Sequence, residues 1–498
     1  MALAPFFERV YGSLGGHLAI SRQSLTLALA KVVVGIRCGP NPSRNDIWIA
    51  ELSTNLLARL YPRIAISGPD EQHVLALKKL AKDINPKIGL VNDSPDATTI
   101  CVGPSTAGGA IFPSASGWVA RVNHTPSQRV GPPNPYAAGA AAAMACAELF
   151  RRIFLKSEAE RDVSVSLLNF DENTGDNLEL IDADISNVLF VGVGAVGNAA
   201  LWAIARDTHT RGRLWLVDGE DVTLSNLQRY VLTSFADVGY SKVLLGQEAL
   251  SGSNWTVETN QSTLEHFIET QGAIDIPVAV VSVDNVEGRR SAQALLPQLV
   301  VNGWTGDQAL GTSWHFFSND AACLACLYHP HGQGSSAVEQ AAKALGLPHD
   351  RAAILWMTRQ PLSSEDIKIV AKSLGVKESV LKPWLTKSLG DIYTDVVCGA
   401  VPLDVTGVGK VETVPLAHQS ALAGILMAAE LLKRTQPELI ALSQPEPLIS
   451  WDDVLRPPPP IWGKPRAREI GCICGDPDYQ KVYAQKWGVQ LKSSGHHG

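Results

Sequence analysis

Short runs of apolar residues bounded by glycine, proline, asparagine or aspartate recur along the chain and predict buried strands. Three of them are Lys31–Ile36, Asn187–Val191 and Pro277–Val283. Continuous apolar runs of this length are typical of parallel strands that helices cover on both faces. Alanine-rich apolar helices are expected at Tyr136–Phe150 and after Val414. The pattern therefore predicts an α/β fold built around parallel sheets.

Two distant stretches of the chain follow the same plan. In the first, Gly131-Pro-Pro-Asn-Pro135 leads into a helix that contains Ala147-Glu-Leu-Phe-Arg-Arg152. In the second, Val414-Pro-Leu-Ala-His418 leads into a helix that contains Ala429-Glu-Leu-Leu-Lys-Arg434. Because a buried strand also opens each half, this self-similarity predicts a Rossmann-like fold in two copies. The alternative is a chance likeness between two alanine-rich helices.

The two expected copies differ in what they can bind. After its opening strand the first copy has Gly35-Ile-Arg-Cys-Gly-Pro40, which is not a Gly-x-Gly-x-x-Gly turn. We therefore expect a degenerate first copy and a complete second copy. The hypothesis is that the first copy has lost its own site and serves as an interface with the second copy, where it can shape the active site.

Composition and charge narrow the class of protein. The chain has 498 residues, of which 45% are hydrophobic and 18% are charged, and its formal net charge is −7. It has no long run of lysine or arginine, which argues against a nucleic-acid surface. The N-terminus lacks the pattern of a signal peptide, and the helix at Tyr136–Phe150 is shorter than a membrane span. We expect a cytoplasmic protein that acts away from membranes.

The most informative motif lies at the start of the second copy. A strand runs into Gly192, Gly194 and Gly197 and then into a helix, an arrangement that presents backbone N–H groups and a positive helix end to phosphate. Asp218 follows the next apolar run and is placed to bind ribose hydroxyls. This pair of features alone also fits a nicotinamide-dependent oxidoreductase.

Cationic and amide residues behind the glycine turn favour a triphosphate instead. Arg229 and Lys242 could neutralise phosphate charge, and Asn226 could hold a phosphate oxygen or orient its neighbours. Asp284 follows a strand and suits magnesium as a hard oxygen ligand. The alternatives are a helix cap at Asp284-Asn285 and a solvated surface lysine at position 242.

Eight cysteines include two close pairs. Cys323 and Cys326 have the two-residue spacing that lets two thiolates bind one tetrahedral zinc, and Cys472 and Cys474 form a tighter pair. Paired cysteines in a large chain without a secretory signal indicate metal ligands rather than disulfides. We predict a structural zinc site with four sulfur ligands; the alternative is a set of buried thiols.

The motifs of the second copy resemble the ThiF/MoeB superfamily, which includes the ubiquitin-activating enzymes. The resemblance covers about 180–475 and rests on the glycine turn, three further blocks and the cysteine pairs. The three blocks are Asp218-Gly-Glu220 with Ser225-Asn-Leu-Gln-Arg229, Val238-Gly-Tyr-Ser-Lys242, and Val283-Asp-Asn285 with Arg289. A single chain with one inactive and one active half resembles the ubiquitin-activating enzymes, and its modest size and reduced first half are similar to compact bacterial versions. Some of these accompany a ubiquitin-like protein, a conjugating enzyme and a deubiquitinase-like peptidase in antiviral operons.

The resemblance implies ATP and magnesium as cofactors and a ubiquitin-like protein with a C-terminal glycine as the partner that is adenylated. It also implies a thioester on Cys398, transfer to a conjugating enzyme, and an arginine from the inactive half against ATP, for which Arg9 and Arg22 compete. Alternatively, Cys398 is a small buried thiol at the end of a strand. A homodimer is one assembly we considered.

The predicted organisation follows from the resemblance. Its parts are an inactive adenylation-like half (1–160), the nucleotide-binding part of the active adenylation domain (180–330), a small helical insert near the catalytic cysteine (331–397), the rest of that domain with a crossover loop and zinc closure (398–475), and a C-terminal tail (476–498). The rival functions are sulfur-carrier adenylation without a thioester, a nicotinamide-dependent oxidoreductase, and a non-catalytic scaffold.

Overall fold

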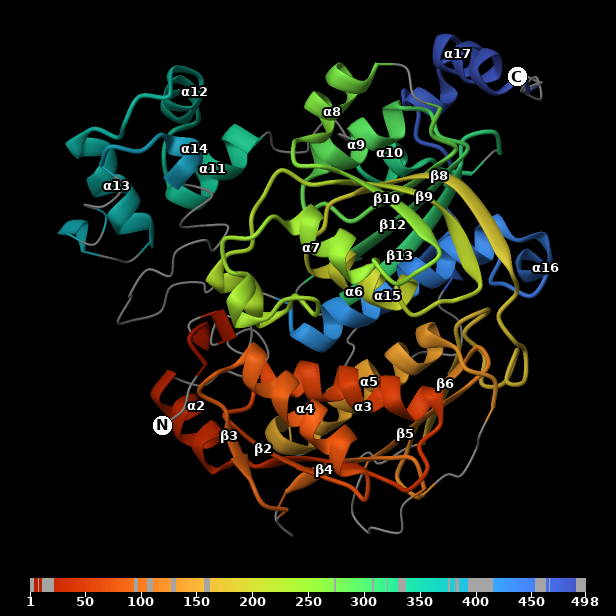
Figure 1. Cartoon of the computed structure of the whole chain (residues 1–498). Coiled ribbons are helices and arrows are strands. Elements are labelled where there is room, and N and C mark those ends of the chain that lie inside the picture. The colour runs from red at the N-terminus through yellow and green to blue at the C-terminus, as the bar shows by residue number, and fades with distance from the viewer. Residues whose placement is uncertain are drawn as a thin grey trace. The chain divides into compact units, whose positions relative to one another are not determined.

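The computed structural model divides into two compact units (Figure 1). The first comprises residues 1–7, 22–329 and 415–498, and the second comprises residues 8–21 and 330–414. The residues that the structure describes are 4–7, 9–10, 22–93, 97–104, 111–126, 131–155, 162–272, 275–306, 309–319, 321–329, 337–374, 377–379, 381, 385–392, 415–452, 463–464 and 466–489. The mixed α/β fold with parallel strands that the apolar pattern predicts is confirmed.

The first half of the larger unit contains a parallel sheet whose strands are ordered β3-β2-β1-β4. Ile100 of β4 forms an isolated parallel bridge with Ile111, just before β5. A separate antiparallel sheet follows, with its strands in the order β5-β6-β7. The elements in chain order are α2 (Arg22–Lys31), β1 (Val34–Cys38), α3 (Arg44–Ala58), β2 (Arg63–Ser67), α4 (Glu71–Ile84), β3 (Gly89–Val91), β4 (Thr98–Val102), β5 (Phe112–Ser116), β6 (Val119–Asn123), α5 (Pro135–Phe150), η1 (Arg151–Leu155) and β7 (Val163–Ser166).

The second half contains a sheet ordered β10-β9-β8-β11-β12-β13-β14-β15, parallel up to β12 and antiparallel beyond it. Its elements are β8 (Ala183–Val191), α6 (Ala195–Ile204), β9 (Thr210–Val217), η2 (Leu224–Gln228), η3 (Phe235–Asp237), α7 (Lys242–Ala249), β10 (Trp255–Asn260), α8 (Leu264–Gln271), β11 (Val278–Val281), α9 (Val286–Ala294), β12 (Leu299–Thr305), β13 (Ala309–Phe316), α10 (Leu324–Leu327), α15 (Ala417–Thr435), α16 (Pro437–Ile440), β14 (Leu448–Asp452), β15 (Gly463–Lys464), η6 (Ile473–Gly475) and α17 (Pro477–Trp487).

The two halves share one strand plan. In each half the first strand lies between the second and the fourth, and an antiparallel pair follows. A long helix comes next, and the strand after it pairs antiparallel with the last member of that pair: β7 with β6 after α5, and β14 with β13 after α15. That the chain holds two copies of one fold, with the first half as an inactive adenylation domain, stays a prediction.

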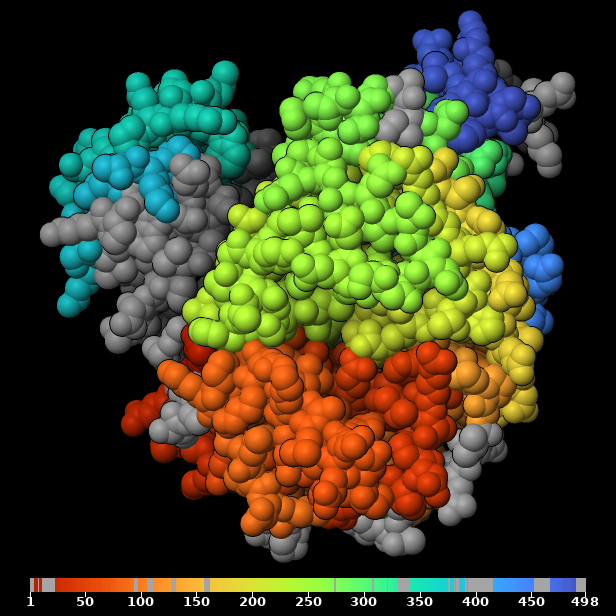
Figure 2. Space-filling model, viewed as in Figure 1, coloured from red at the N-terminus to blue at the C-terminus, as the bar shows by residue number. Residues whose placement is uncertain are grey.

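The long helices α5 and α15 join the two halves. Their small residues allow close approach: a Cβ on Gly139 would lie 2.8 Å from Ile425 Cδ1 in the other half, and a Cβ on Gly424 would lie 2.1 Å from the carbonyl oxygen of Val196 on α6 of its own half. In Figure 2 the orange surface of the first half meets the yellow-green surface of the second. The alanine-rich composition therefore serves tight helix packing.

The second unit is a small helical unit with its own core. It contains α11 (Ala337–Leu345), α12 (His349–Thr358), α13 (Ser364–Leu374) and α14 (Leu389–Ile392). Buried residues of these helices, among them Leu345, Leu355 and Val370, form one apolar cluster. At the start of α13 the Ser363 hydroxyl donates to Asp366, whose carboxylate also pairs with Arg351 at 2.7 Å.

Within the described residues, no helix is both long enough and apolar enough to cross a bilayer. The segment 476–498 is predicted as a C-terminal tail. The segment expected as a tail begins with helix α17, whose Tyr483 packs among the paired cysteines. The Trp487 indole N–H also donates to the carbonyl oxygen of Leu296 at 2.8 Å. Helix α17 is therefore part of the fold, because its apolar face closes the cysteine core.

Candidate functional site

The glycine turn lies at the carboxyl end of β8, the central strand of the parallel part. Gly192 has φ +90°, a conformation that favours glycine, and Gly194 is the N-cap of α6. A Cβ on Gly197 would lie 2.3 Å from the carbonyl oxygen of Gly192. The backbone can therefore turn tightly here and point the N-terminus of α6 at the edge of the sheet, as phosphate binding requires.

Asp218 follows β9 and ties the glycine turn to the neighbouring strand. Its Oδ2 accepts from the backbone N–H of Val193 at 2.7 Å, and its Oδ1 accepts from that of Glu220 at 2.9 Å. Burial raises the pKa of Asp218 above its ordinary value, although the charge of Lys242 and both backbone donors oppose the rise. The carboxylate lies at the carboxyl edge of the parallel strands, and its binding of ribose hydroxyls stays a prediction.

Lys242 begins helix α7, and its side chain is 3% exposed. The ammonium pairs with the carboxylate of Glu220 and lies 5.3 Å from the centre of the Tyr230 ring. Burial alone would lower the pKa of Lys242, but the nearby Tyr230, Asp218 and Glu220 raise it well above its ordinary value. Lys242 is therefore a firmly charged, buried cation beside Asp218 and not the solvated surface lysine of the alternative interpretation.

The segment 224–230 carries Asn226 and Arg229. The side chain of Asn226 accepts from the backbone N–H of Thr223 at 2.9 Å and caps the turn η2, so it orients its own segment. The Arg229 guanidinium carbon lies 5.9 Å from the centre of the Tyr230 ring, and its Nη1 donates to Gln228 Oε1 at 3.4 Å. The Tyr230 ring thus lies near both Arg229 and Lys242.

Asp284 lies just beyond β11, and its neighbours explain how that loop is held. Asn285 is the N-cap of α9 and accepts from the backbone N–H of Gly288 at 2.6 Å. Buried Arg289 donates to the carbonyl oxygen of Val283, and another of its N–H groups donates to Asn302 at 2.8 Å. Asn285 is therefore the cap, while the exposed carboxylate of Asp284 is left at the sheet edge, as a magnesium ligand would need.

Three residues of this site were not predicted from the sequence. Glu220 pairs with Lys242. The Tyr230 ring lies beside Lys242, and its hydroxyl would be 3.6 Å from a Cβ added to Gly194. Asn198 donates to the carbonyl oxygen of Val193 at 2.8 Å and accepts from the N–H of Leu232 at 3.2 Å. Their positions inside or next to the matching motifs were the only available signal.

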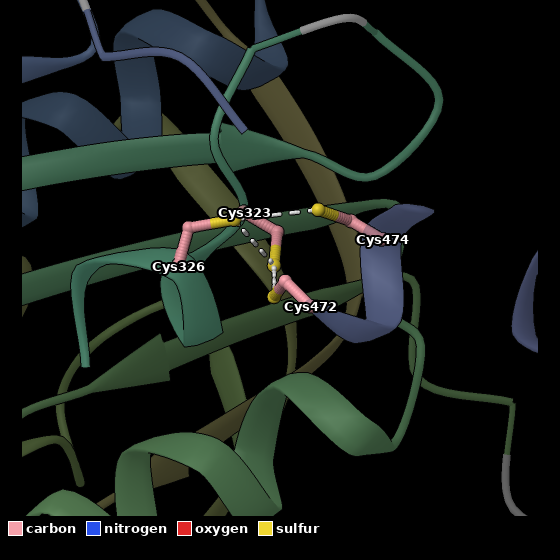
Figure 3. A group of neighbouring side chains, drawn as sticks. All are labelled: Cys323, Cys326, Cys472 and Cys474. Carbon is pink, nitrogen blue, oxygen red and sulfur yellow. Dashed lines mark hydrogen bonds between the residues drawn. The ribbon is translucent and has the colours of Figure 1, made fainter. Parts of the chain in front are cut away.

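The four paired cysteines converge into one buried cluster (Figure 3). Their sulfur atoms lie within 4.8 Å of one another, with Cys323 to Cys326 at 3.8 Å, Cys323 to Cys472 at 3.6 Å and Cys326 to Cys474 at 3.3 Å. Tetrahedral zinc with Zn–S bonds of about 2.3 Å needs sulfur atoms about 3.8 Å apart. The backbone N–H of Glu469 also donates to Cys326 Sγ at 3.4 Å. The geometry fits a closed metal site.

Other expected site residues are not tested. Cys398 and the loop 404–410 lie outside the described residues. Arg22 opens helix α2, but its side chain also lies outside the description, and Arg9 belongs to the second unit. The choice between these two arginines therefore stays open.

Comparison with known proteins places two matches on the chain. Residues 177–438, more than half of it, match the model of the ThiF family, and residues 45–155 match a model described as prokaryotic E2 family C. The uncharacterized protein y4jF of Sinorhizobium fredii is 34% identical over 521 residues, covering 99% of this chain and 98% of that protein.

Other similar proteins are less identical or match over less of this chain. Adenylyltransferase and sulfurtransferase MOCS3-1 of Zea mays is 30% identical over 152 residues, which is 29% of this chain and 31% of that protein. Among solved structures, E. coli MccB with ATP has a TM-score of 0.36 at 14% identity, covering 74% of this chain and 98% of that chain. PaaA has a TM-score of 0.22 at 26% identity, covering 26% and 40%. These TM-scores are low, so the fold is described from the sheet order of this chain itself.

Proposed function

Because the chain belongs to the ThiF family, whose members are adenylyltransferases, we propose that it adenylates the C-terminal glycine of a ubiquitin-like protein. The observation that carries this proposal is a buried cation, Lys242, near the partly buried carboxylate of Asp218 at one sheet edge. Asp218 and Lys242 lie beside the glycine turn and influence each other's pKa. An oxidoreductase would use the glycine turn and Asp218 but has no need of a buried lysine there.

In the proposed reaction the substrate carboxylate attacks the α-phosphorus of ATP. An oxygen–phosphorus bond forms to the carboxylate, the bond to the β-phosphate breaks, and pyrophosphate leaves. Both reactants are anions, so catalysis depends on positioning and charge neutralisation. The N–H groups at the start of α6 would hold phosphate oxygens, Asp218 the ribose, and Lys242 and Arg229 the developing negative charge. Magnesium, held by Asp284, would supply further neutralisation when bound.

We propose that the cysteine cluster holds a structural zinc ion. The support is four buried sulfur atoms at distances that suit a tetrahedron. Four sulfur ligands leave no open position, so the ion would join the end of the chain, residues 472–487, to the rest of the domain. The helix α17 and Cys323–Cys326 would be held together through it.

The next proposed step is attack of the Cys398 thiolate on the acyl-adenylate, with AMP as the leaving group, followed by transfer to a conjugating enzyme. The alternative ends at the adenylate, as in sulfur-carrier activation. We propose no acyl-carrying role for the stretch that matches prokaryotic E2 family C, because its two cysteines, Cys101 and Cys146, are buried. A role in antiviral defence remains a prediction from the resemblance alone.

Pyrophosphate exchange tests the proposed function. The chain is incubated with Mg·ATP, labelled pyrophosphate and a panel of ubiquitin-like proteins ending in glycine, with each partner also supplied without that glycine. Exchange that requires the glycine supports the proposal, and protection of the chain from heat by NAD but not by ATP contradicts it. A reducible adduct that persists in Cys398→Ala would contradict the assignment of the thioester to Cys398, whereas exchange without any reducible adduct in the wild-type chain would favour the sulfur-carrier alternative.

A further inference from the structure

The C-terminal end of helix α3 in the first half contacts the segment 224–233 of the second half. The helix begins at a capping box between Ser43 and Asp46, and its far end carries Asn55 and the C-cap residue Arg59. Asn55 is 5% exposed and Arg59 is 1% exposed. A buried guanidinium is costly unless all its donors are used, so its partners indicate what it is for.

Those partners are backbone carbonyls of the other half. Arg59 Nη1 donates to the carbonyl oxygen of Leu227 at 2.6 Å, and Nη2 donates to that of Thr233 at 2.8 Å. Its Nε donates to Asn55 Oδ1 at 2.9 Å, which leaves the Asn55 amide to donate to the carbonyl oxygen of Val231 at 2.8 Å. Two side chains of the first half thus hold three carbonyls of the 224–233 segment.

The same segment is also linked by hydrogen bonds to the glycine turn. Asn198 on α6 accepts from the N–H of Leu232 and donates to the carbonyl oxygen of Val193. The N–H of Val193 in turn donates to Asp218. The segment that carries Asn226, Arg229 and Tyr230 is therefore fixed between α3 of one half and the glycine turn of the other.

We infer that Arg59, supported by Asn55, is a positioning residue through which the first half sets the geometry of the nucleotide site. The inference rests on the proposed function, since it assigns the 224–233 segment to ATP. Arg59 does not touch the nucleotide; it fixes the backbone that aims Arg229 and Tyr230. Burial lowers the pKa of Arg59 to about 9, so the guanidinium still carries its charge at pH 7.

The test compares three variants of the full chain. Arg59→Lys keeps the charge but lacks the planar fork that reaches two separate carbonyls. Asn55→Ala removes the third carbonyl contact. The matched control is Arg206→Met, because Arg206, after α6, pairs with Glu51 on the same helix α3 and donates to the carbonyl oxygen of Trp202, both outside the 224–233 segment. It therefore perturbs another contact of α3 with the second half and leaves the 224–233 segment untouched.

The readouts are the Kd of Mg·ATP by calorimetry, the Tm without nucleotide, and amide hydrogen exchange of peptides covering 224–233. For Arg59→Lys we expect Kd to rise about tenfold or more and exchange in 224–233 to increase, with a smaller effect for Asn55→Ala. For Arg206→Met we expect the Kd of Mg·ATP to stay within about twofold of the wild-type value, even if the Tm falls.

Two outcomes overturn the inference while leaving the proposed function intact. One is wild-type ATP affinity in Arg59→Lys. The other is an equal loss of ATP affinity in Arg59→Lys and Arg206→Met, because the effect would then come from general weakening of the contact between halves. If the wild-type chain itself binds no Mg·ATP, the proposed function fails instead.

Discussion

Lys242 and Glu220 form an ion pair with opposite degrees of exposure: the lysine side chain is 3% exposed and the glutamate side chain is 76% exposed. The buried ammonium lies near the Tyr230 ring and the charge of Asp218, while its carboxylate partner is exposed to solvent. A ligand phosphate could therefore replace the carboxylate without moving the lysine. This arrangement leads to the first prediction.

Lys242→Met should abolish detectable Mg·ATP binding, because it removes the buried cation next to Asp218. Glu220→Gln should lower the Kd for ATP by about two- to fivefold, since it removes a negative charge that competes with phosphate at a partly exposed site. Calorimetry on both variants, with exposed Lys79→Met as the control, measures the effect. Unchanged ATP affinity in Lys242→Met would show that the lysine takes no part in binding ATP.

Gly197→Ala should damage the glycine turn. The new Cβ would lie 2.3 Å from the Gly192 carbonyl oxygen, so the turn must shift, at a cost of about 1–3 kcal/mol of stability. We expect ATP affinity to fall about tenfold or more. Gly252→Ala is the matched control, because nothing lies within 4 Å of a Cβ there. Equal ATP affinity in the two variants would show that the turn tolerates the change and that its shape does not matter for binding.

The cysteine cluster should bind one zinc ion per chain. Cys474→Ser should lower the zinc content measured by mass spectrometry of metals and lower the Tm by several degrees, because structural zinc stabilises the fold it binds. A chelator should reduce the Tm of the wild-type chain and have little further effect on the variant. Cys146→Ala, which changes a buried thiol outside the cluster, should keep its zinc. A zinc-free wild-type chain after metal-supplemented expression would contradict the proposed site.

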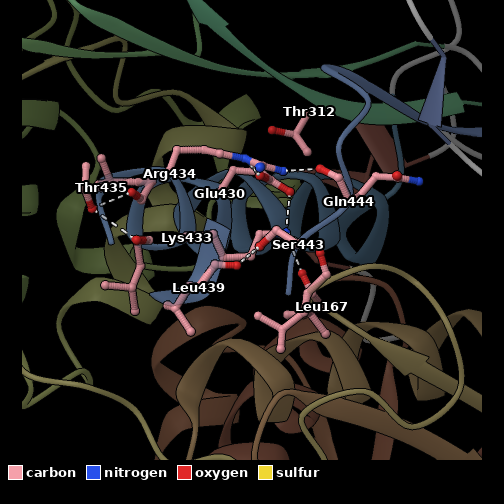
Figure 4. Close-up of polar contacts among 12 residues, drawn as sticks. Leu167, Thr312, Glu430, Lys433, Arg434, Thr435, Leu439, Ser443 and Gln444 are labelled. Carbon is pink, nitrogen blue, oxygen red and sulfur yellow. Dashed lines mark hydrogen bonds and ion pairs between the residues drawn. The ribbon is translucent and has the colours of Figure 1, made fainter. Parts of the chain in front are cut away.

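Lys433 on α15 should give stability an alkaline pH dependence. Its ammonium is fully buried, lies 2.5 Å from Glu430 and donates to the carbonyl oxygen of Leu167 at 2.6 Å (Figure 4). Burial is the main cause of a pKa lowered to about 8, and the charge of Arg434 adds to it, although Glu430 opposes both. Between pH 8 and the ordinary value of 10.5 the unfolded chain holds the proton that the folded chain has lost, so this group's contribution to stability rises with pH.

The comparison of the wild-type chain with Lys433→Met measures this effect. The Tm of the wild-type chain relative to the variant should rise from pH 7.5 to pH 9.5. A difference that stays level or falls over this interval would show that the lysine keeps its proton in the folded state. Both chains are compared in the same buffers, so that other groups titrate equally in the two.

Local motifs of the second half could be recognised from the sequence because each depends on near neighbours. The glycine turn, Asp218 and Lys242 meet at the carboxyl edge of parallel strands, where the order of short apolar runs and turn residues places them. The cysteine pairs could be recognised as well, because the close spacing within each pair is typical of ligands that share one metal ion, and the two pairs do meet in the structure. The repeated strand plan and the two alanine-rich helices follow from the same local patterns of apolar and small residues.

Tertiary structure decided what depends on contacts between distant segments. The sequence of α3 contains nothing that marks Asn55 and Arg59 as partners of Leu227, Val231 and Thr233, since 168 or more positions separate them. Likewise, helix α17 became part of the fold only through packing against the cysteine core. Short-range spacing specifies turns, caps and ligand pairs, whereas the burial of a polar side chain against another half is set by the whole packed interface, which no local pattern encodes.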